Sequence, residues 1–101
     1  MKVKYEEHFK EDYIRVIQNV SGAAKFNREL QSVVNMLQNG SALPDRYVVN
    51  RIAKSGKGWY ECYVYHDERD CIVMYYRIYE QCVYLCRIGT PSMLMDLDKG
   101  E

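Results

Sequence analysis

The residue best suited to chemistry in this sequence is Arg87, which lies in the stretch Val83–Met95, VYLCRIGTPSMLM. The apolar residues before it predict a short strand, and Gly89 and Thr90 predict a turn after it. A guanidinium carries a planar fork of donors that can hold a phosphate through two parallel hydrogen bonds. A simpler alternative is that Arg87 makes an ion pair with a nearby acid such as Glu61.

A second cationic feature is the segment from Arg46 to Tyr60, which contains basic residues and no acid. The formal net charge of the chain is zero, so the broad basic surface typical of nucleic-acid enzymes is absent and only a local patch can form. Such a segment can bind phosphates, or it can be an ordinary solvated loop. Its basic residues are Arg46, Arg51, Lys54 and Lys57.

Composition indicates one folded, soluble domain. The chain has 101 residues, of which 48% are hydrophobic and 28% charged, enough for one modest core. No apolar run approaches the length of a membrane-spanning helix, and the N-terminus has no apolar signal-peptide core. We therefore expect a cytoplasmic protein without a membrane partner.

The four cysteines are expected to be free thiols, mostly buried. Cys82 and Cys86 fall four residues apart in a predicted strand, so they lie about 13 Å apart on one face. That separation is too long for a disulfide or for a shared tetrahedral metal.

The pattern of apolar residues predicts a strand over residues 2–5, a helix over 8–20 and a second helix over 27–39, which Ala23 and Ala24 can extend. A long connection follows, and then three strands joined by short polar turns, which favours antiparallel hairpins. These strands are expected at 59–65, 71–79 and 82–88, with residues 96–101 as a frayed acidic tail. The pattern alone therefore predicts a small α+β domain.

Three short motifs occur in a fixed order: LPDRY at residues 43–47, GWY at residues 58–60 and RIGT at residues 87–90. This order resembles the RelE superfamily of bacterial toxins, and most closely its YafQ branch. The resemblance implies one toxin domain over residues 1–101, with an N-terminal strand and a helical hairpin packed on a twisted, mainly antiparallel sheet. The opposite, concave face of the sheet carries the active site in that superfamily.

The resemblance also implies an activity and partners. Toxins of this branch are small ribonucleases that cut messenger RNA on the ribosome, and a cognate antitoxin protein holds them in check. They cleave through attack of the ribose 2′-hydroxyl on the neighbouring phosphate, without a metal or other cofactor. We therefore expect a toxin of a type II toxin–antitoxin system whose partners are an antitoxin, the ribosome and mRNA.

The chain departs from the YafQ pattern at its histidines. The YafQ pattern has a histidine in its basic loop, where this chain has Asn50. The pattern also has a histidine after the Gly-Thr turn and a phenylalanine beyond it, where this chain has Pro91 and Met95. An Asp-x-His pair on the second strand falls at Glu61 and Tyr63. The next acid falls at Asp70, or at Asp67 if the short insertion is placed differently, and the arginine is retained as Arg87.

The resemblance suggests roles for these positions. Arg87 would hold the phosphate, Glu61 would act as general base, and Tyr63 would donate a proton or stack on a base. His66, the only histidine of the sheet half, could replace a lost acid or base. Each of these three side chains also has a purely structural interpretation, as an exposed strand acid, a packing tyrosine and an exposed loop histidine. Further phosphate contacts would come from Arg46, Arg51, Lys54 and Lys57.

The loss of all three histidines leaves a second function open. The chain could be a catalytically impaired binding protein on the toxin scaffold, which binds an antitoxin or RNA, or which inhibits gyrase as the ParE branch does.

Overall fold

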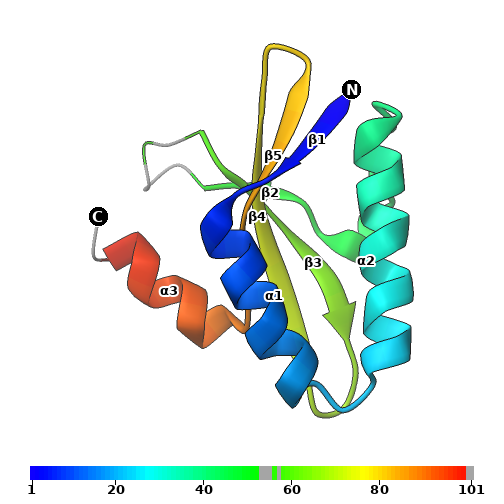
Figure 1. The fold of residues 1–101 in the computed structure, drawn as a ribbon, viewed down its shortest axis with the longest axis vertical. Helices are drawn as coiled ribbons and strands as arrows, with labels where there is room; N and C mark the ends of the chain where they lie inside the picture. The colour runs from blue at the N-terminus through cyan, green and yellow to red at the C-terminus, as the bar shows by residue number, and fades with distance from the viewer. Residues whose placement is uncertain (53–55, 57, 100–101) are drawn as a thin grey trace.

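The computed structural model describes residues 1–52, 56 and 58–99, and it has the α+β architecture expected from the sequence (Figure 1). A five-stranded sheet is combined with three α-helices and one 3-10 turn. In chain order the elements are β1 (Lys2–Tyr5), α1 (Glu7–Asn19), α2 (Ala23–Gln38), η1 (Asp45–Tyr47), β2 (Asn50–Arg51), β3 (Tyr60–His66), β4 (Cys71–Tyr79), β5 (Cys82–Gly89) and α3 (Pro91–Lys99).

The strands are arranged in the order β1-β5-β4-β3-β2. Strand β1 runs parallel to β5, and every other neighbouring pair is antiparallel. The β4–β5 hairpin closes through Glu80 and Gln81, which both have positive φ, at 48° and 64°. A two-residue turn of this kind matches the right-handed twist of the flanking strands. The mainly antiparallel sheet predicted from the short connections is confirmed.

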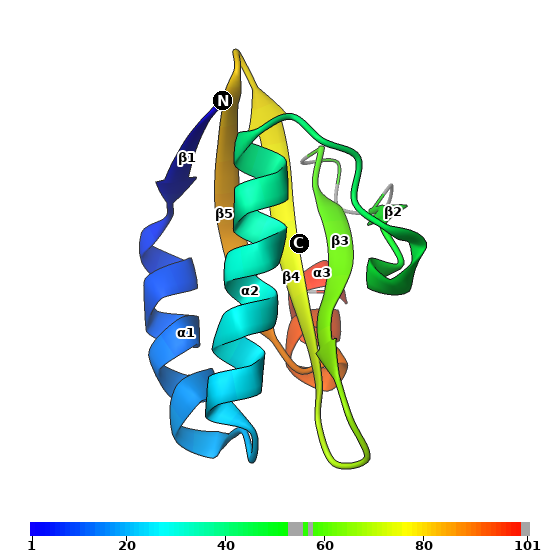
Figure 2. The same cartoon turned by 90° about the vertical axis from the view of Figure 1, so that its right-hand side faces the viewer.

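Helices α1 and α2 form an antiparallel hairpin over one face of the sheet (Figure 2). Their apolar stripes have helical spacing, so a single face of each helix is buried against β3, β4 and β5. The core on this face includes Phe9 and Val16 of α1, together with Phe26, Leu30, Val33, Val34 and Leu37 of α2.

The opposite face of the sheet carries a smaller apolar cluster, which α3 partly covers (Figure 2). Leu94 of α3 is buried against Val73 and Tyr75 of β4 and Cys86 of β5. Trp59 and Tyr63 add half-buried rings to the cluster. Helix α3 therefore covers part of this face and leaves the rest accessible, so the face can bind a partner.

The structure fixes the ends of the helices. Helix α2 begins at Ala23, within the extension that the two alanines allowed, so Asn27 lies inside the helix and accepts a hydrogen bond from the Tyr13 hydroxyl at 2.6 Å. The expected frayed tail is wrong for residues 96–99, which belong to α3, while residues 100–101 lie outside the described part. Pro91 occupies the first position of α3 and Thr90 precedes it as cap, an arrangement that favours a helix start.

The four cysteines are free thiols, with Cys62 and Cys86 buried and Cys71 and Cys82 half-buried. Burial raises the pKa of both Cys62 and Cys86 to about 12. Within the described part of the chain, no helix is long and apolar enough to cross a membrane.

Candidate active site

The strongest site candidate is a row of side chains that crosses four strands on the face partly covered by α3. Register pairs join Asn50 to Glu61, Glu61 to Tyr75, and Tyr75 to Arg87. Residues opposite one another in neighbouring strands point to the same face, and Tyr75 belongs to the cluster under α3. We call these four residues the cross-strand row. Since neighbouring strands lie about 4.8 Å apart, the Cα atoms of Glu61 and Arg87 are about 10 Å apart.

Arg87 enters this row through an irregularity in β5. The register shifts between Tyr75 and Tyr76, so Cys86 has no partner on β4 and the next residue comes to face Tyr75. A bulge of this kind redirects a side chain within an otherwise regular ladder. Without the shift, simple alternation from the core residue Leu85 would turn Arg87 towards the helices.

The Arg87 guanidinium is held by Asp12 of α1. Its Nε donates to Asp12 Oδ2 at 2.7 Å, and its Nη2 donates to Oδ1 at 2.9 Å. The side chain of Asp12 is 2% exposed and that of Arg87 is 21% exposed. Hydrogen bonding to Asp12 raises the pKa of Arg87, against the lowering effect of burial, so the guanidinium stays charged. The ion pair considered from the sequence therefore exists, but its acid is Asp12 and not Glu61.

Glu61 is the second residue of β3 and is half-buried. Its Oε1 accepts a hydrogen bond from Asn50 Nδ2 at 3.3 Å, so the residue at the loop-histidine position contacts the candidate base. Tyr63 lies two residues further along the same face, opposite Val73. Burial, then the nearby Glu61 and Cys71, raise the pKa of Tyr63, so its phenol keeps its proton at neutral pH and is available as a proton donor.

Neither of the two described basic residues of the segment from Arg46 to Tyr60 lies in the row. Arg46 donates to the Tyr47 hydroxyl at 2.6 Å and lies over the Tyr47 ring, which raises its pKa. Arg51 pairs with Tyr60, so alternation puts it on the face opposite to Glu61. Lys54 and Lys57 lie outside the described residues.

Asp70 and His66 do not join the row. Asp70 Oδ2 accepts hydrogen bonds from the backbone N–H of Ser21 at 3.1 Å and from its hydroxyl at 2.8 Å, which ties the β3–β4 hairpin to the α1–α2 turn. His66 is exposed at the end of β3, and five residues of strand, about 16 Å, separate it from Glu61. The structure does not bring Asp70 or His66 together with the row, because the hairpin loop lies at the far end of the strands.

Asp67, the alternative acid, also has a structural place. It accepts hydrogen bonds from the Tyr65 hydroxyl and from the backbone N–H groups of Arg69 and Asp70. The bonds from Asp70, Tyr65 and Arg69 lower the pKa of Asp67 and keep it ionised within the turn. Both hairpin acids therefore make structural hydrogen bonds within or next to the loop.

Pro91 and Met95, the positions of the exit histidine and the following phenylalanine in the YafQ pattern, both lie on α3. Pro91 begins that helix and cannot transfer a proton, and Met95 is 52% exposed on it. Tyr75 donates to the backbone oxygen of Leu94 at 3.5 Å, so α3 packs directly beside the row. Among the described residues, no three His, Cys, Asp or Glu side chains gather closely enough to hold a metal ion.

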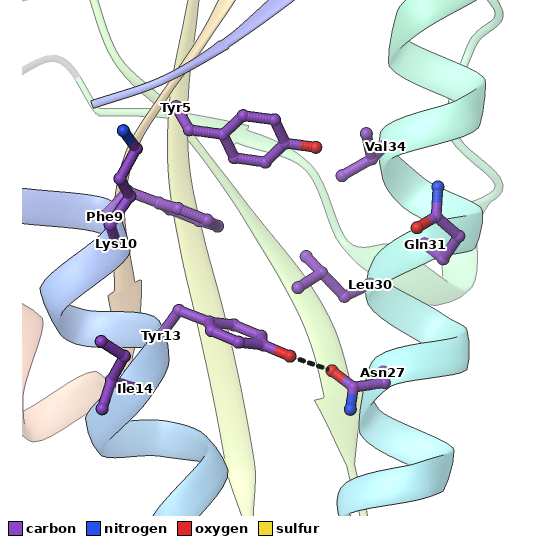
Figure 3. Close-up of a pocket in the computed structure, with 9 residues that line it drawn as sticks. All are labelled: Tyr5, Phe9, Lys10, Tyr13, Ile14, Asn27, Leu30, Gln31 and Val34. Atoms are coloured by element: carbon purple, nitrogen blue, oxygen red, sulfur yellow. Dashed lines mark hydrogen bonds between the residues drawn. The ribbon is translucent and has the colours of Figure 1, made fainter. Parts of the chain in front are cut away.

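Two hollows lie outside the row. A groove of about 510 Å³ runs between α1 and α2, and its lining is mostly apolar (Figure 3). We call it the helical groove; it is lined by Tyr5, Phe9, Lys10, Tyr13, Ile14, Asn27, Leu30, Gln31 and Val34. A second cavity of about 430 Å³ beside η1 brings His66 together with Lys25, Arg28 and Arg46.

Sequence reasoning missed Asp12, although a signal was present. Asp12 falls between Phe9 and Val16 on the buried side of α1, where an acid is rare unless it has a partner. It also missed α3, whose start was marked by the Thr90-Pro91 pair.

Comparisons with known proteins agree with this architecture. The sequence model of the YafQ toxin family, described as a bacterial toxin of a type II toxin–antitoxin system, matches residues 1–96. Comparison with curated protein sequences finds no significant match.

Several solved structures have the same fold. YafQ from E. coli strain BL21(DE3) has a TM-score of 0.72 at 22% identity, covering 92% of this chain and 96% of that one. A metal-bound toxin from Helicobacter pylori has a TM-score of 0.73 at 23% identity, covering 93% and 98%. The E. coli DinJ–YafQ complex matches with a TM-score of 0.70 at 21% identity, covering 92% and 96%.

Proposed function

Because this chain belongs to the YafQ family of bacterial toxins of type II toxin–antitoxin systems, we propose that it is an endoribonuclease that cleaves mRNA on the ribosome. The observation that carries the proposal is the cross-strand row, which puts a carboxylate and an oriented guanidinium on one face. Attack of a 2′-hydroxyl on the neighbouring phosphate needs a base, a cation at the phosphorane and an acid for the leaving 5′-oxygen.

The row can supply these parts without histidine. Glu61 takes the 2′-hydroxyl proton, and Asn50 orients its carboxylate. Arg87 holds the phosphate as negative charge builds on it. Tyr63 keeps its proton at neutral pH and serves as donor to the leaving oxygen. The Cα atoms of Glu61 and Arg87 lie about 10 Å apart on either side of the buried Tyr75, a separation that a ribose and its phosphate can bridge.

The test is controlled expression in bacteria, with growth followed and mRNA 5′ ends mapped with and without translation blocked. Wild type and Glu68→Gln are expected to arrest growth and to produce translation-dependent cuts, since Glu68 is exposed in the hairpin. Glu61→Gln removes the base and is expected to slow cleavage about 100-fold or more. Healthy growth without new 5′ ends would instead indicate the catalytically impaired binding protein, and arrest without cuts would indicate gyrase inhibition.

We further propose that a cognate antitoxin covers the helical groove (Figure 3). Tyr5 lines one end of the groove and ends β1, which is an edge strand of the sheet. One partner chain can therefore pair with β1 and lay an apolar helix face between α1 and α2. Exposed Lys2, Lys4 and Lys10 lie on β1 and at the rim, so the complementary segment is acidic.

Ile14 is 56% exposed in the groove, and Ile78 is 48% exposed at the far end of β4. Ile14→Glu is expected to abolish co-purification with an antitoxin encoded next to the toxin while growth arrest persists. Ile78→Glu, an equally exposed matched control, should keep the complex. If both variants bind the antitoxin normally, the groove is not its docking site.

A further inference from the structure

Asp12 is a buried carboxylate for which the proposed chemistry has no direct use. It lies on α1, its side chain is 2% exposed, and within the described residues the hydrogen bonds of its carboxylate all go to β5. We infer that Asp12 is a positioning residue that fixes the orientation of the Arg87 guanidinium for phosphate binding, an inference that rests on the proposed nuclease function.

The position of Asp12 follows from the way the sheet ends. Strand β1 pairs with β5 only as far as Tyr5 opposite Leu85, and α1 then takes its place beside the strand. Beyond that point the backbone N–H of Ile88 has no strand partner, and Asp12 Oδ2 accepts from it at 3.1 Å. The carboxylate is therefore anchored to the backbone of the residue that follows Arg87.

An anchored carboxylate is an effective clamp for a long side chain. The Asp12 oxygens take the Nε and Nη2 donors, which form one edge of the guanidinium. A guanidinium has five N–H donors, so this leaves one on Nη2 and two on Nη1. One N–H from each Nη points along the other edge, which is the edge that can hold a phosphate through two parallel bonds.

That second edge is open within the described part of the chain. No hydrogen bond there involves Nη1, and the Arg87 side chain is 21% exposed beside Tyr75 in the cross-strand row, so we take this edge as the one that a phosphate can reach. Asp12 thus holds one edge of the guanidinium and presents the other. An unanchored arginine would lose rotamer entropy on binding a phosphate, whereas here that loss has occurred on folding.

The opposite role is also conceivable from the charges alone. A carboxylate beside Arg87 reduces the field that a phosphate feels, so Asp12 could restrain the arginine and lower its activity. The two roles predict opposite signs. Asp12→Asn removes the charge but keeps an acceptor for the Ile88 N–H. If Asp12 positions Arg87, this variant cleaves more slowly than wild type; if Asp12 restrains Arg87, it cleaves faster.

The first experiment measures cleavage of a defined mRNA on purified ribosomes by wild type, Asp12→Asn, Asp12→Glu and Val16→Ala. Val16 is buried one turn further along α1 and belongs to the apolar core, so Val16→Ala controls for general loss of stability. We expect Asp12→Asn to lower kcat about 10- to 100-fold with little change in KM, because misplacement by about 1 Å has effects of this size. Val16→Ala should keep the wild-type kcat below its melting temperature.

Asp12→Glu keeps the charge but moves the carboxylate by one methylene. If Asp12 served only to balance charge, Asp12→Glu would restore kcat; under positioning, kcat stays low. The double variant Asp12→Asn/Arg87→Lys should be no slower than Arg87→Lys alone, because Asp12 acts through Arg87. Wild-type or faster cleavage by Asp12→Asn would overturn the inference.

A second measurement is independent of nuclease activity. In ¹⁵N NMR spectra, the Arg87 Nε–H should give a sharp, slowly exchanging signal in wild type and Val16→Ala, and should lose it in Asp12→Asn. Retention of the signal in Asp12→Asn would overturn the positioning role even for a protein that does not cleave RNA. If wild type does not cleave RNA, only the proposed nuclease function is refuted. The NMR result would still decide the role of Asp12.

Discussion

Replacing Arg87 with alanine should destabilise the fold as well as the site. Arg87→Ala leaves the Asp12 carboxylate, 2% exposed, with the Ile88 N–H as its one remaining hydrogen bond in the described part of the chain. Breaking a buried pair by removing one partner costs about 3–5 kcal/mol. Small domains unfold with only about 5–15 kcal/mol, so this single change removes a large share of the stability.

The size of the effect makes it easy to measure. For a domain of this length, each 1 kcal/mol shifts the melting temperature by about 4–8 °C, so Arg87→Ala should lower it by about 20 °C. Urea unfolding at pH 7 should give the same loss of free energy with an unchanged m-value. A loss below about 1 kcal/mol would refute the reasoning, because it would mean that the Asp12 charge does not depend on Arg87.

A matched double variant separates stability from activity. Asp12→Asn/Arg87→Met removes both charges, keeps an acceptor for the Ile88 N–H and fills a similar volume. Replacing a buried ion pair by neutral groups is often close to neutral, so we expect more than half of the lost stability to return. Cleavage should stay absent in this variant, which would assign the loss to the missing guanidinium and not to unfolding.

Three further outcomes are expected. Cys62 and Cys86, whose pKa is raised to about 12 by burial, should resist iodoacetamide at pH 8 in the native state and react on unfolding, as mass spectrometry would show. Glu80→Asn/Gln81→Gly should raise stability by about 1–2 kcal/mol in urea titration without changing cleavage, because both residues adopt positive φ. Pro91→His should cost about 0.5–1 kcal/mol by freeing the first position of α3, yet raise the initial cleavage rate; an unchanged rate would mean that this helix start does not deliver a proton donor to the row.

The elements of this fold were largely predictable because each one is encoded locally. The spacing of Phe9, Val16 and their neighbours predicts α1, and the short polar connections after β3 and β4 predict the hairpins. Arg87 and Glu61 could be placed on the correct strands for the same reason. What these patterns do not contain is the register shift at Cys86 that turns Arg87 into the cross-strand row.

The failures concern contacts between distant parts of the chain. Asp12 and Arg87 are 75 residues apart, and no local pattern specifies which acid pairs with an arginine. The resemblance placed an acid of the family pattern at Asp70, and in the structure its carboxylate accepts a hydrogen bond from Ser21, 49 residues earlier. Such partners are fixed by packing of the helices on the sheet, which single-sequence patterns do not describe.

The long separation between Asp12 and Arg87 has a consequence for protein synthesis. Ribosomes release the N-terminal part first, so α1 emerges well before β5 exists. The parallel pairing of β1 with β5 and the clamp on the arginine both form only when the last strand has been made. Such non-local contacts also form late in folding. A nascent chain that stalls before β5 therefore has neither the β1–β5 pairing nor the ion pair between Asp12 and Arg87.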